Sequence, residues 1–550
     1  MISTFALVAG SAATALGADR ARRRLILSKA KHPSLAGHVR WGKRIAALIP
    51  GNCYDAAEAF RIDGARAEIE SARRAGFERL AAYYAQTFPV SRALTAETRS
   101  GLSDLQFTGR YRVPFQFADM VSTTLAAGAF WEKSEGPRLT DPDGNGFWDL
   151  TGSYGVNVLG NEAYKDLMRE GAATGEALGA VLGGLHPIVA DNVKRLKAIS
   201  GLDEVSFHMS GTEAVMQAVR LARYHTGKRH LVRFCGAYHG WWGDVQPGIG
   251  NPVPADGTYT LADMSERSLR VLRTRKNIAC VLVNPLQALH PNRGAPGDSA
   301  LVAGRDLAAA DRATYAEWLK RLAAVCRERG IVLILDDVFT GFRLAPGGAA
   351  EYYGVTPDIV TYGKTLGGGF PVGVVCGKAA LMRRFREDRP VDICFARGTF
   401  NSHPYVMGAM NAFLRRLEEP ATRALYEGQD TRWTARAASL NARLGERDLP
   451  LRVTNLASIW TIHYTAPSRY NWMLQYYLRA EGLALSWVGT GRLIFSLDYD
   501  DAAFADVADR FVAAALRMRA DGWWWFPKGA TGKKIGRQLL KEAIRGRLGR

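Results

Sequence analysis

From about residue 160 onward, short apolar runs alternate with segments whose apolar residues recur at helical spacing. Strands covered by helices on both sheet faces read as continuous apolar runs, because neither face meets water. The runs are EVSFHMS, HLVRFCG, IACVLVNP and GIVLILDD, and helices are expected in GTEAVMQAVRLARYHTG and RATYAEWLKRLAAVCRERG. This alternation predicts an α/β domain with a mostly parallel sheet.

Other patterns lie on either side of this region. Residues 54–110 predict helices, and DPDGNGFWDLTGSYGVNVLG (141–160) predicts a hairpin. After a long helix near residue 406, RVTNLASIWTIHY predicts a strand, NWMLQYYLRAEGL a helix, GRLIFSLDY a strand and DDAAFADVADRFVAAALRM a helix. The expected divisions are a helical extension with an apolar and basic leader (1–105), a hairpin segment (106–160), a large domain (161–405), a small C-terminal α+β domain (406–520) and a basic amphipathic tail (521–550).

Charge changes this picture mainly at the two ends of the chain. The 550 residues carry a net charge of +19, in a composition of 47% hydrophobic and 23% charged residues that is ordinary for a globular protein. Residues 20–31 hold six basic residues and no acid, and residues 528–550 hold eight basic residues and one acid. Basic ends on an ordinary body fit an anionic membrane surface better than a nucleic acid, which is not expected as a partner. Solvated tails that aid solubility are the alternative.

The two ends also carry apolar segments. Residues 2–18 are uncharged, but they are short of the roughly 20 residues of a spanning helix and lack the basic start of a secretory signal. In the tail, a helix would place Ile535, Leu539, Leu540, Ile544 and Leu548 near one face among basic residues, as interfacial helices do. Six scattered cysteines fit free thiols, and no metal site is expected. We therefore expect a cytoplasmic protein, with membrane association through either end as the added hypothesis.

The candidate chemistry begins with Gly-Lys-Thr in TYGKTLGGGFPVGVV (361–375). A phosphate-binding P-loop would need a glycine at position 358, which is Asp358, so that signature fails. Lys364 instead stands between an expected strand and a glycine-rich turn, where the backbone can approach a ligand closely. Desolvation there would lower its pKa toward nucleophilic use.

Two further segments supply complementary groups. Ser210, Gly211 and Thr212 join a strand to the first turn of a helix, which is an anion site, although a plain N-cap is the alternative. Asp336 ends an apolar strand, where ligands bind in parallel sheets, and it could hold a cationic ring nitrogen or cap a helix. Val338 would pack on a flat ligand or on the core.

A phosphate cradle, an anion for a pyridinium nitrogen and an amine for a Schiff base are together what pyridoxal phosphate requires. The chain resembles the class III (fold type I) aminotransferases, and within them the glutamate-1-semialdehyde aminomutase-like branch. The resemblance rests on SGTEAVMQAVRLARYHTG, GAYHGWWGD, LILDDVFTGFR, DIVTYGKTLGGGFPVG and RGTFNSHPYVMGAMNAFL, and it spans roughly residues 106–515. It implies a large domain with a seven-stranded, mostly parallel sheet flanked by helices, and a homodimer with active sites at the interface.

The resemblance also implies roles for individual residues. Lys364 would form the internal aldimine and Asp336 would pair with the pyridine nitrogen. Tyr238 would stack on one ring face and Val338 would pack on the other. The remaining expected cofactor contacts are the phosphate-binding Ser210, Gly211 and Thr212, with His239 and, from the neighbouring subunit, Thr399.

Departures from the family pattern gather on the substrate side. Asp337 stands where the family has Glu, Asn284 replaces the Glu of Val-Glu-Pro, and His403 occupies a position where small residues are common. The family's Gly-His-x-His-Pro is absent, with GNEAYKDL in its place. The candidate substrate residues are Ser153, Tyr154, Arg112 and His403, and Arg112 could equally form a structural ion pair.

The expected activity is transfer of an amino group between a donor amine or amino acid and an aldehyde or keto acceptor, through a Lys364 Schiff base. The freed lysine would then move the proton between substrate and cofactor. An aminomutase would use the same steps on one retained substrate. A membrane-associated cofactor-binding scaffold without turnover is the alternative of a different class.

Overall fold

The computed structural model describes residues 2–31, 39–51, 53–111, 113–246, 250–251, 256–262, 264–289, 311–486 and 492–548. Its centre is a seven-stranded sheet in the order β4-β10-β9-β8-β7-β5-β6. Only β10 runs antiparallel to its neighbours. The predicted mostly parallel seven-stranded sheet is confirmed. Its strands are β4 (Glu204–His208), β5 (His230–Phe234), β6 (Thr258–Leu261), β7 (Ile278–Val283), β8 (Val332–Asp336), β9 (Ile359–Gly363) and β10 (Gly373–Gly377).

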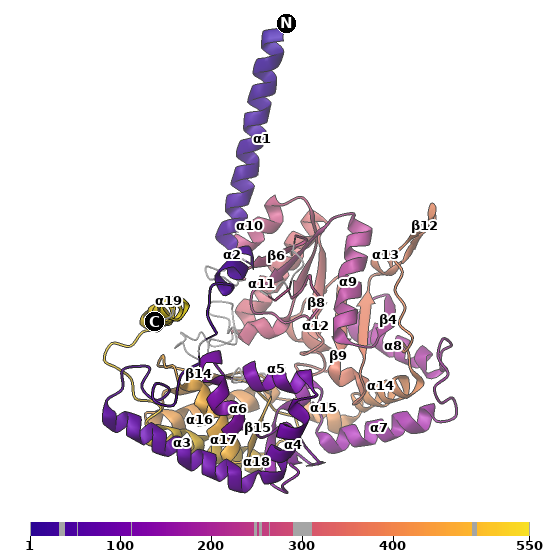
Figure 1. Ribbon diagram of the computed structural model, residues 1–550. Helices are drawn as coiled ribbons and strands as arrows, with labels where there is room; N and C mark the ends of the chain where they lie inside the picture. The colour runs from indigo at the N-terminus through magenta and orange to yellow at the C-terminus, as the bar shows by residue number, and fades with distance from the viewer. Residues whose placement is uncertain are drawn as a thin grey trace.

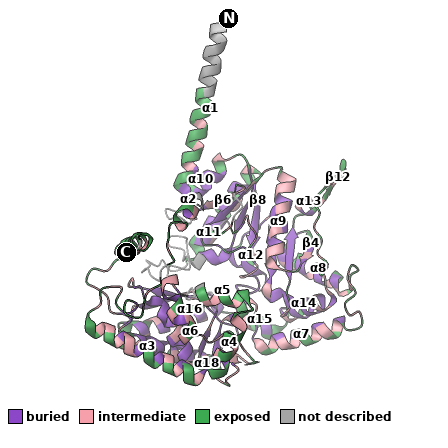
Figure 2. Ribbon diagram, in the orientation of Figure 1, coloured by how far each residue is buried: buried purple, intermediate pink, exposed green. Residues whose placement is uncertain are grey.

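Helices cover the sheet because its central strands are apolar on both faces. Every residue of β7, β8 and β9 is buried, and Figure 2 shows this centre in the buried colour. The predicted helix 211–227 is α9, which ends at Gly227 with a left-handed φ of 63°. The surrounding helices are α7 (Asn161–Gly175), α8 (Ile188–Ser200), α9 (Gly211–Thr226), α10 (Glu266–Thr274), α11 (Arg312–Arg329), α12 (Gly348–Tyr353), α13 (Ala379–Met382) and α14 (Pro404–Arg416).

A second body of structure combines the N-terminal helices with the C-terminal part of the chain. Phe77, Leu80 and Tyr84 of α3 share one buried cluster with Trp460 and Trp523. Figure 1 shows α3, α4, α16 and α18 side by side in this region. The elements are α3 (Ala67–Thr87), α4 (Pro89–Arg99), α5 (Ser103–Tyr111), α6 (Ala118–Thr124), α15 (Pro420–Tyr426), α16 (Gln429–Glu446), β13 (Leu451–Leu456), β14 (Ile459–Tyr464), α17 (Leu474–Ala480), β16 (Arg492–Ile494) and α18 (Asp501–Ala520).

Two details differ from expectation. RVTNLASIWTIHY is not one strand but the hairpin β13–β14, turning at Ala457 with a left-handed φ of 46°. The hairpin expected over residues 141–160 begins earlier and is shorter. Strand β2 pairs with β3, and a 3₁₀ turn follows at Gly152–Gly155. The small strands are β1 (Lys133–Glu135), β2 (Arg138–Thr140), β3 (Gly146–Leu150) and β15 (Leu483–Leu485), with a projecting pair β11 (Phe385–Arg386) and β12 (Arg389–Ile393).

The chain ends form helices at the surface. In Figure 1, α1 (Ile2–Ala30) projects from the body, and its base contacts α10 through the buried Leu27 and Ala30. The short α2 (Val39–Ala46) follows, and α19 (Gly532–Arg547) ends the described chain. Within the described residues, no helix combines the length and the apolar content needed to cross a membrane. The domain divisions given above stay predictions.

Candidate active site

The carboxyl ends of parallel strands meet at one edge of the large sheet. Asp336 ends β8, and Lys364 directly follows β9, its parallel neighbour. Beyond β10, β4 runs in the same direction as β9 and leads to Ser210 and α9. The topology therefore brings three segments that are distant in sequence to the edge where ligands bind in such sheets.

Asp336 is buried and held from three sides. Its carboxylate accepts hydrogen bonds from His239 Nδ1 at 2.6 Å, from the Val338 backbone N–H at 3.2 Å and from Thr361 Oγ1 at 3.3 Å. Burial lowers the pKa of His239, and the Asp336 carboxylate acts against that shift. A neutral His239 must carry its proton on Nδ1, because a carboxylate can only accept. Its Nε2 is then an acceptor, buried and without a hydrogen-bond partner among the described residues.

Lys364 stands in a strained and partly desolvated position. Its φ of 44° is left-handed, which is unusual for a residue with a side chain. Burial lowers the pKa of its amine, against a raising influence of Asp336. The ring of Phe339 lies 5.7 Å from Nζ. A larger fraction of neutral amine makes this lysine a better nucleophile and proton carrier.

The amino end of α9 faces the same edge. Ser210 is the N-cap of this helix, and its Oγ accepts from the Glu213 backbone N–H at 3.2 Å. The hydroxyl proton and the first free N–H groups of the helix can still be donated to an anion. Two glycines let neighbouring segments approach. A Cβ on Gly211 would lie 2.6 Å from Val338 Cγ1, and one on Gly240 would collide with Thr212 Oγ1.

The predicted ring-packing residues border this edge. Tyr238 is 60% exposed, and its backbone carbonyl accepts a hydrogen bond of 3.0 Å from Asn284 Nδ2. Partial burial and the Asp336 charge raise the pKa of its phenol. Val338 is half-buried and touches both the Gly211 and Gly363 backbones. An exposed tyrosine and a half-buried valine at this edge are side chains that can pack on a flat ligand.

The predicted substrate residues are placed differently from one another. Ser153 and Tyr154 form a left-handed turn (φ 46° and 57°), and a Cβ on the next residue, Gly155, would lie 3.4 Å from Lys364 Cδ. This turn therefore adjoins the lysine. His403 caps α14, accepting the Tyr405 backbone N–H at 3.3 Å through Nδ1. Arg112 lies outside the described residues.

Thr399 is exposed in the single chain. Its expected contact with the cofactor of a second subunit stays a prediction.

Three neighbours of the site were not foreseen from the sequence. Thr361 could have been noticed because it is a polar residue in an otherwise apolar strand. It lies two residues before Gly363 and therefore on the same face of the sheet. Phe339, next to Lys364, and the contact from Asn284 to the Tyr238 backbone carry no comparable sequence signal. The departure from the family pattern at Asp337 has a structural reason. Its carboxylate accepts hydrogen bonds from the Ala349 backbone N–H at 2.7 Å and from Thr340 Oγ1 at 2.5 Å, and it thereby holds the loop that leads into α12.

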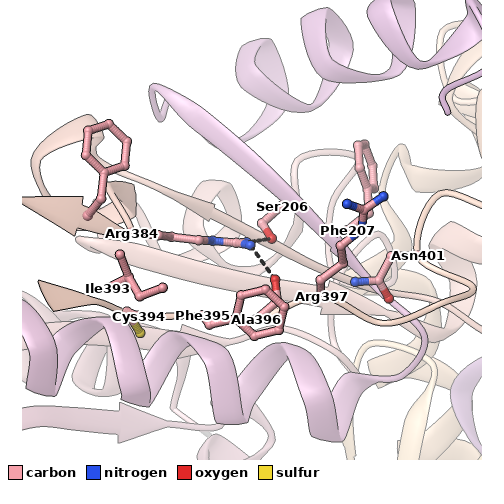
Figure 3. Close-up of a pocket in the computed structure, with 10 residues that line it drawn as sticks. Ser206, Phe207, Arg384, Ile393, Cys394, Phe395, Ala396, Arg397 and Asn401 are labelled. Carbon is pink, nitrogen blue, oxygen red and sulfur yellow. Dashed lines mark hydrogen bonds between the residues drawn. The ribbon is translucent and has the colours of Figure 1, made fainter. Parts of the chain in front are cut away.

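A surface hollow of about 440 Å³ lies beside the β11–β12 pair. Figure 3 shows Arg384 reaching across it toward Ser206 and Ala396. These hydrogen bonds connect the segment that follows β12 to strand β4. None of the residues of the Lys364 edge described above lines the hollow, so it is a separate feature of the surface.

A comparison with protein-family models decides the assignment. The model of the class-III aminotransferases matches residues 121–243 and 308–514. The chain belongs to the class-III aminotransferases. The predicted family and enzyme class are thereby confirmed, and the match contains Lys364, Asp336 and the α9 segment.

Individual relatives agree with the family. The chain is 35% identical over 360 residues to a glutamate-1-semialdehyde 2,1-aminomutase of Desulfotalea psychrophila, covering 61% of this aminotransferase chain and 76% of that protein. It is 32% identical over 359 residues to the enzyme of the same name from Methanocaldococcus jannaschii, covering 61% and 76%.

Solved structures give the same fold, which confirms the fold type I expectation. A structure described as a transaminase with PLP bound has a TM-score of 0.60 at 26% identity, covering 72% of this aminotransferase and 92% of that chain. A glutamate-1-semialdehyde aminomutase from Pseudomonas aeruginosa has a TM-score of 0.64 at 18% identity, covering 82% and 99%.

Proposed function

We propose that this aminotransferase uses pyridoxal phosphate to move an amino group between a donor amine or amino acid and an aldehyde or keto acceptor. The observation that carries the proposal is the shared sheet edge: a partly desolvated Lys364, the buried Asp336–His239 pair and the open start of α9. Together they offer an amine, an anion and a phosphate cradle within one family whose solved members include a transaminase with PLP bound.

The residues fit this cofactor. The absence of Cβ atoms at Gly211 and Gly240 lets Val338 and Thr212 pack directly against these backbones, where a side chain would collide. The α9 N–H groups and the Ser210 hydroxyl can donate to a phosphate. The buried Asp336 carboxylate would accept a hydrogen bond from a ring nitrogen of the cofactor. When bound, the cofactor supplies an electron sink for charge developing on the substrate carbon.

The chain's own residues would then do the following. Lys364 holds the cofactor, and once displaced by the donor amine its neutral Nζ takes and returns a proton. Asp336 keeps a proton on the ring nitrogen, because its burial and three donors fix the carboxylate there. His239 positions Asp336, and the Ser153–Tyr154 turn adjoins Lys364, where it would contact the substrate.

An intramolecular aminomutase is the second candidate, favoured by the names of the two curated relatives described above. The same lysine would serve both reactions. The two differ in whether nitrogen leaves with a separate product. Isotopically labelled donor nitrogen that appears in a distinct acceptor product marks transamination, and its retention within one carbon skeleton marks mutation.

We further propose that the enzyme is a homodimer with Thr399 completing the site of the second subunit. Large apolar side chains are exposed on the two segments that carry Tyr238 and Thr399: Tyr238, Trp241 (78%), Phe395 (67%) and Phe400 (50%). An exposed apolar area of this kind is typical of an interface. Light scattering on the purified enzyme tests the state, and Thr399→Val should weaken cofactor retention without separating the subunits.

Lys364→Ala tests the proposed function directly. The wild-type enzyme should carry bound cofactor, and borohydride should fix it to the peptide that contains residue 364. The variant should lose that modification and lower kcat roughly 10³-fold or more. Lys378→Ala is a matched control, since Lys378 is an exposed lysine paired with Asp358. Fixation at another lysine in the wild-type protein would contradict the assignment.

A further inference from the structure

Two basic elements from opposite ends of the chain lie outside the segments that the family model matches. They are α2 with its following turn (41–49) and α19. The Arg547 guanidinium donates a hydrogen bond of 3.4 Å to the Leu48 carbonyl, which places the end of α19 against that turn. We refer to the two together as the α2–α19 surface.

The inner side of α19 is anchored to the body by its one acid. Glu542 accepts from Arg469 at 2.6 and 3.0 Å and from Tyr54 Oη at 2.5 Å. The Arg469 side chain is only 3% exposed, so this is an ion pair at the buried base of the helix. Gln538 donates to the Ile62 carbonyl one turn earlier. The single acidic side chain of α19 is therefore turned inward and paired with Arg469.

Among the residues that the structure describes, none covers the outer side of α19. Leu540, Ile544 and Leu548, at a spacing of four residues, are 61%, 51% and 69% exposed. Basic residues stand beside this stripe at Arg537, Lys541, Arg545 and Arg547. Figure 2 shows α19 in the exposed colour, and none of its residues is buried. The predicted apolar face is thus split, since Ile535 and Leu539 are half-buried on the inner side.

The neighbouring α2 segment has the same character. Trp41, Leu48 and Ile49 are 60%, 51% and 47% exposed. The Arg44 guanidinium lies 5.4 Å from the Trp41 ring. Lys43 is bonded to the Asn251 carbonyl, which attaches α2 to the large domain. Exposed tryptophan and aliphatic side chains flanked by basic residues are typical of interfacial membrane segments.

We propose that the α2–α19 surface binds an anionic lipid bilayer, with both elements lying in the plane of the headgroups. Charge and composition together select this occupant. A second copy of the same basic face would be repelled by like charge. A nucleic acid would match the charge, but it would leave the Leu540, Ile544, Leu548 and Trp41 side chains without a role.

Flotation of the full-length holoenzyme with lipid vesicles tests the proposal. The vesicles are phosphatidylcholine alone and phosphatidylcholine with phosphatidylserine. Leu540→Ser/Ile544→Ser removes the apolar stripe, and Lys541→Gln/Arg545→Gln removes two charges, without touching Glu542. The matched controls are Leu102→Ser, a leucine 42% exposed elsewhere, and Arg423→Gln/Arg452→Gln, two exposed arginines on other elements.

The wild-type enzyme should float with the anionic vesicles and not with the neutral ones, and added salt should weaken the binding. The charge variant should lower the partition coefficient roughly thirtyfold and the apolar variant by about tenfold or more. Both controls should bind as the wild type does, and cofactor content should be equal in all proteins.

Three results would overturn the proposal. One is failure of the wild-type enzyme to bind anionic vesicles. Another is unchanged binding in both α19 variants with loss on removing residues 1–18, since that would assign the interaction to α1. The third is tight binding of a polyuridine RNA that competes with vesicles and is insensitive to Leu540→Ser/Ile544→Ser, which would indicate a general polyanion site.

Discussion

The Lys364 edge and the α2–α19 surface are built in opposite ways. At the edge, the buried Asp336 carboxylate is fixed by three hydrogen bonds, from His239, Val338 and Thr361. The α19 helix is instead attached through a few side chains, chiefly Glu542, and exposes its remaining charges. A catalytic group has to be held in one geometry before the substrate binds. A surface for a lipid bilayer needs no such fixed geometry, so a few anchoring contacts can add it to an existing fold.

The sharpest test of the first half of this comparison is Asp336→Asn. The variant should lower kcat by roughly 10²- to 10⁴-fold, because the group that we propose pairs with the ring nitrogen loses its charge. Asp337→Asn is the adjacent, equally buried control and should leave kcat within about threefold, since Asp337 binds Thr340 and the start of α12. Equal losses in both variants, measured by single-turnover kinetics, would contradict separate roles for the two carboxylates.

His239→Asn should have an intermediate effect. It removes the 2.6 Å hydrogen bond to Asp336 while the carboxylate keeps two donors, so we expect kcat to fall roughly tenfold. As a positioning residue, His239 should also alter the absorbance spectrum of the bound cofactor, since the ring nitrogen would lose its fixed partner. An unchanged spectrum with lower thermal stability would reduce His239 to a packing role.

Glu542→Gln tests the second half of the comparison. Losing the carboxylate weakens the attachment to Arg469 and Tyr54, and α19 should become a target for limited proteolysis between residues 521 and 548. The kcat should change less than twofold, because the Lys364 edge belongs to the seven-stranded sheet and not to the region that holds α19. Conversely, a large fall in kcat would mean that the anchor communicates with the site.

The contributions of the two regions to stability should depend on pH in opposite directions. Burial raises the pKa of Asp337 to about 7, so its contribution to stability is present at acid pH and is lost as pH rises through about 7. Burial also acts to raise the pKa of Glu542, but its bonds to Arg469 and Tyr54 outweigh this and lower it, so its contribution is lost as pH falls below 4.5.

The unfolding midpoint of Asp337→Asn should therefore rise relative to that of the wild type when the pH is changed from 5 to 8. The shift should be of a few degrees or less. A pH-independent difference, measured by thermal denaturation, would contradict the raised pKa.

The sequence predicted the sheet, α9 and the Lys364 segment well, because buried parallel strands and glycine-rich turns leave local signals. It missed the turn at Ala457, where a residue with a side chain adopts a left-handed φ and no Gly, Asn or Asp marks the reversal. It also could not show that α3 packs against the C-terminal part. That contact depends on side chains hundreds of residues apart, for which periodicity carries no information.

The pairing of the first helices with the last third of the chain affects how the protein is made. Tyr84 donates to the backbone of Tyr476, 392 residues later, and Tyr83 to that of Ala480, 397 residues later. At synthesis rates of about 5–20 residues per second, the faces of α3 and α4 emerge from the ribosome roughly 20–80 s before their partners exist. During that interval the apolar face of α3 lacks its partners, so slow translation should favour aggregation of this enzyme over folding.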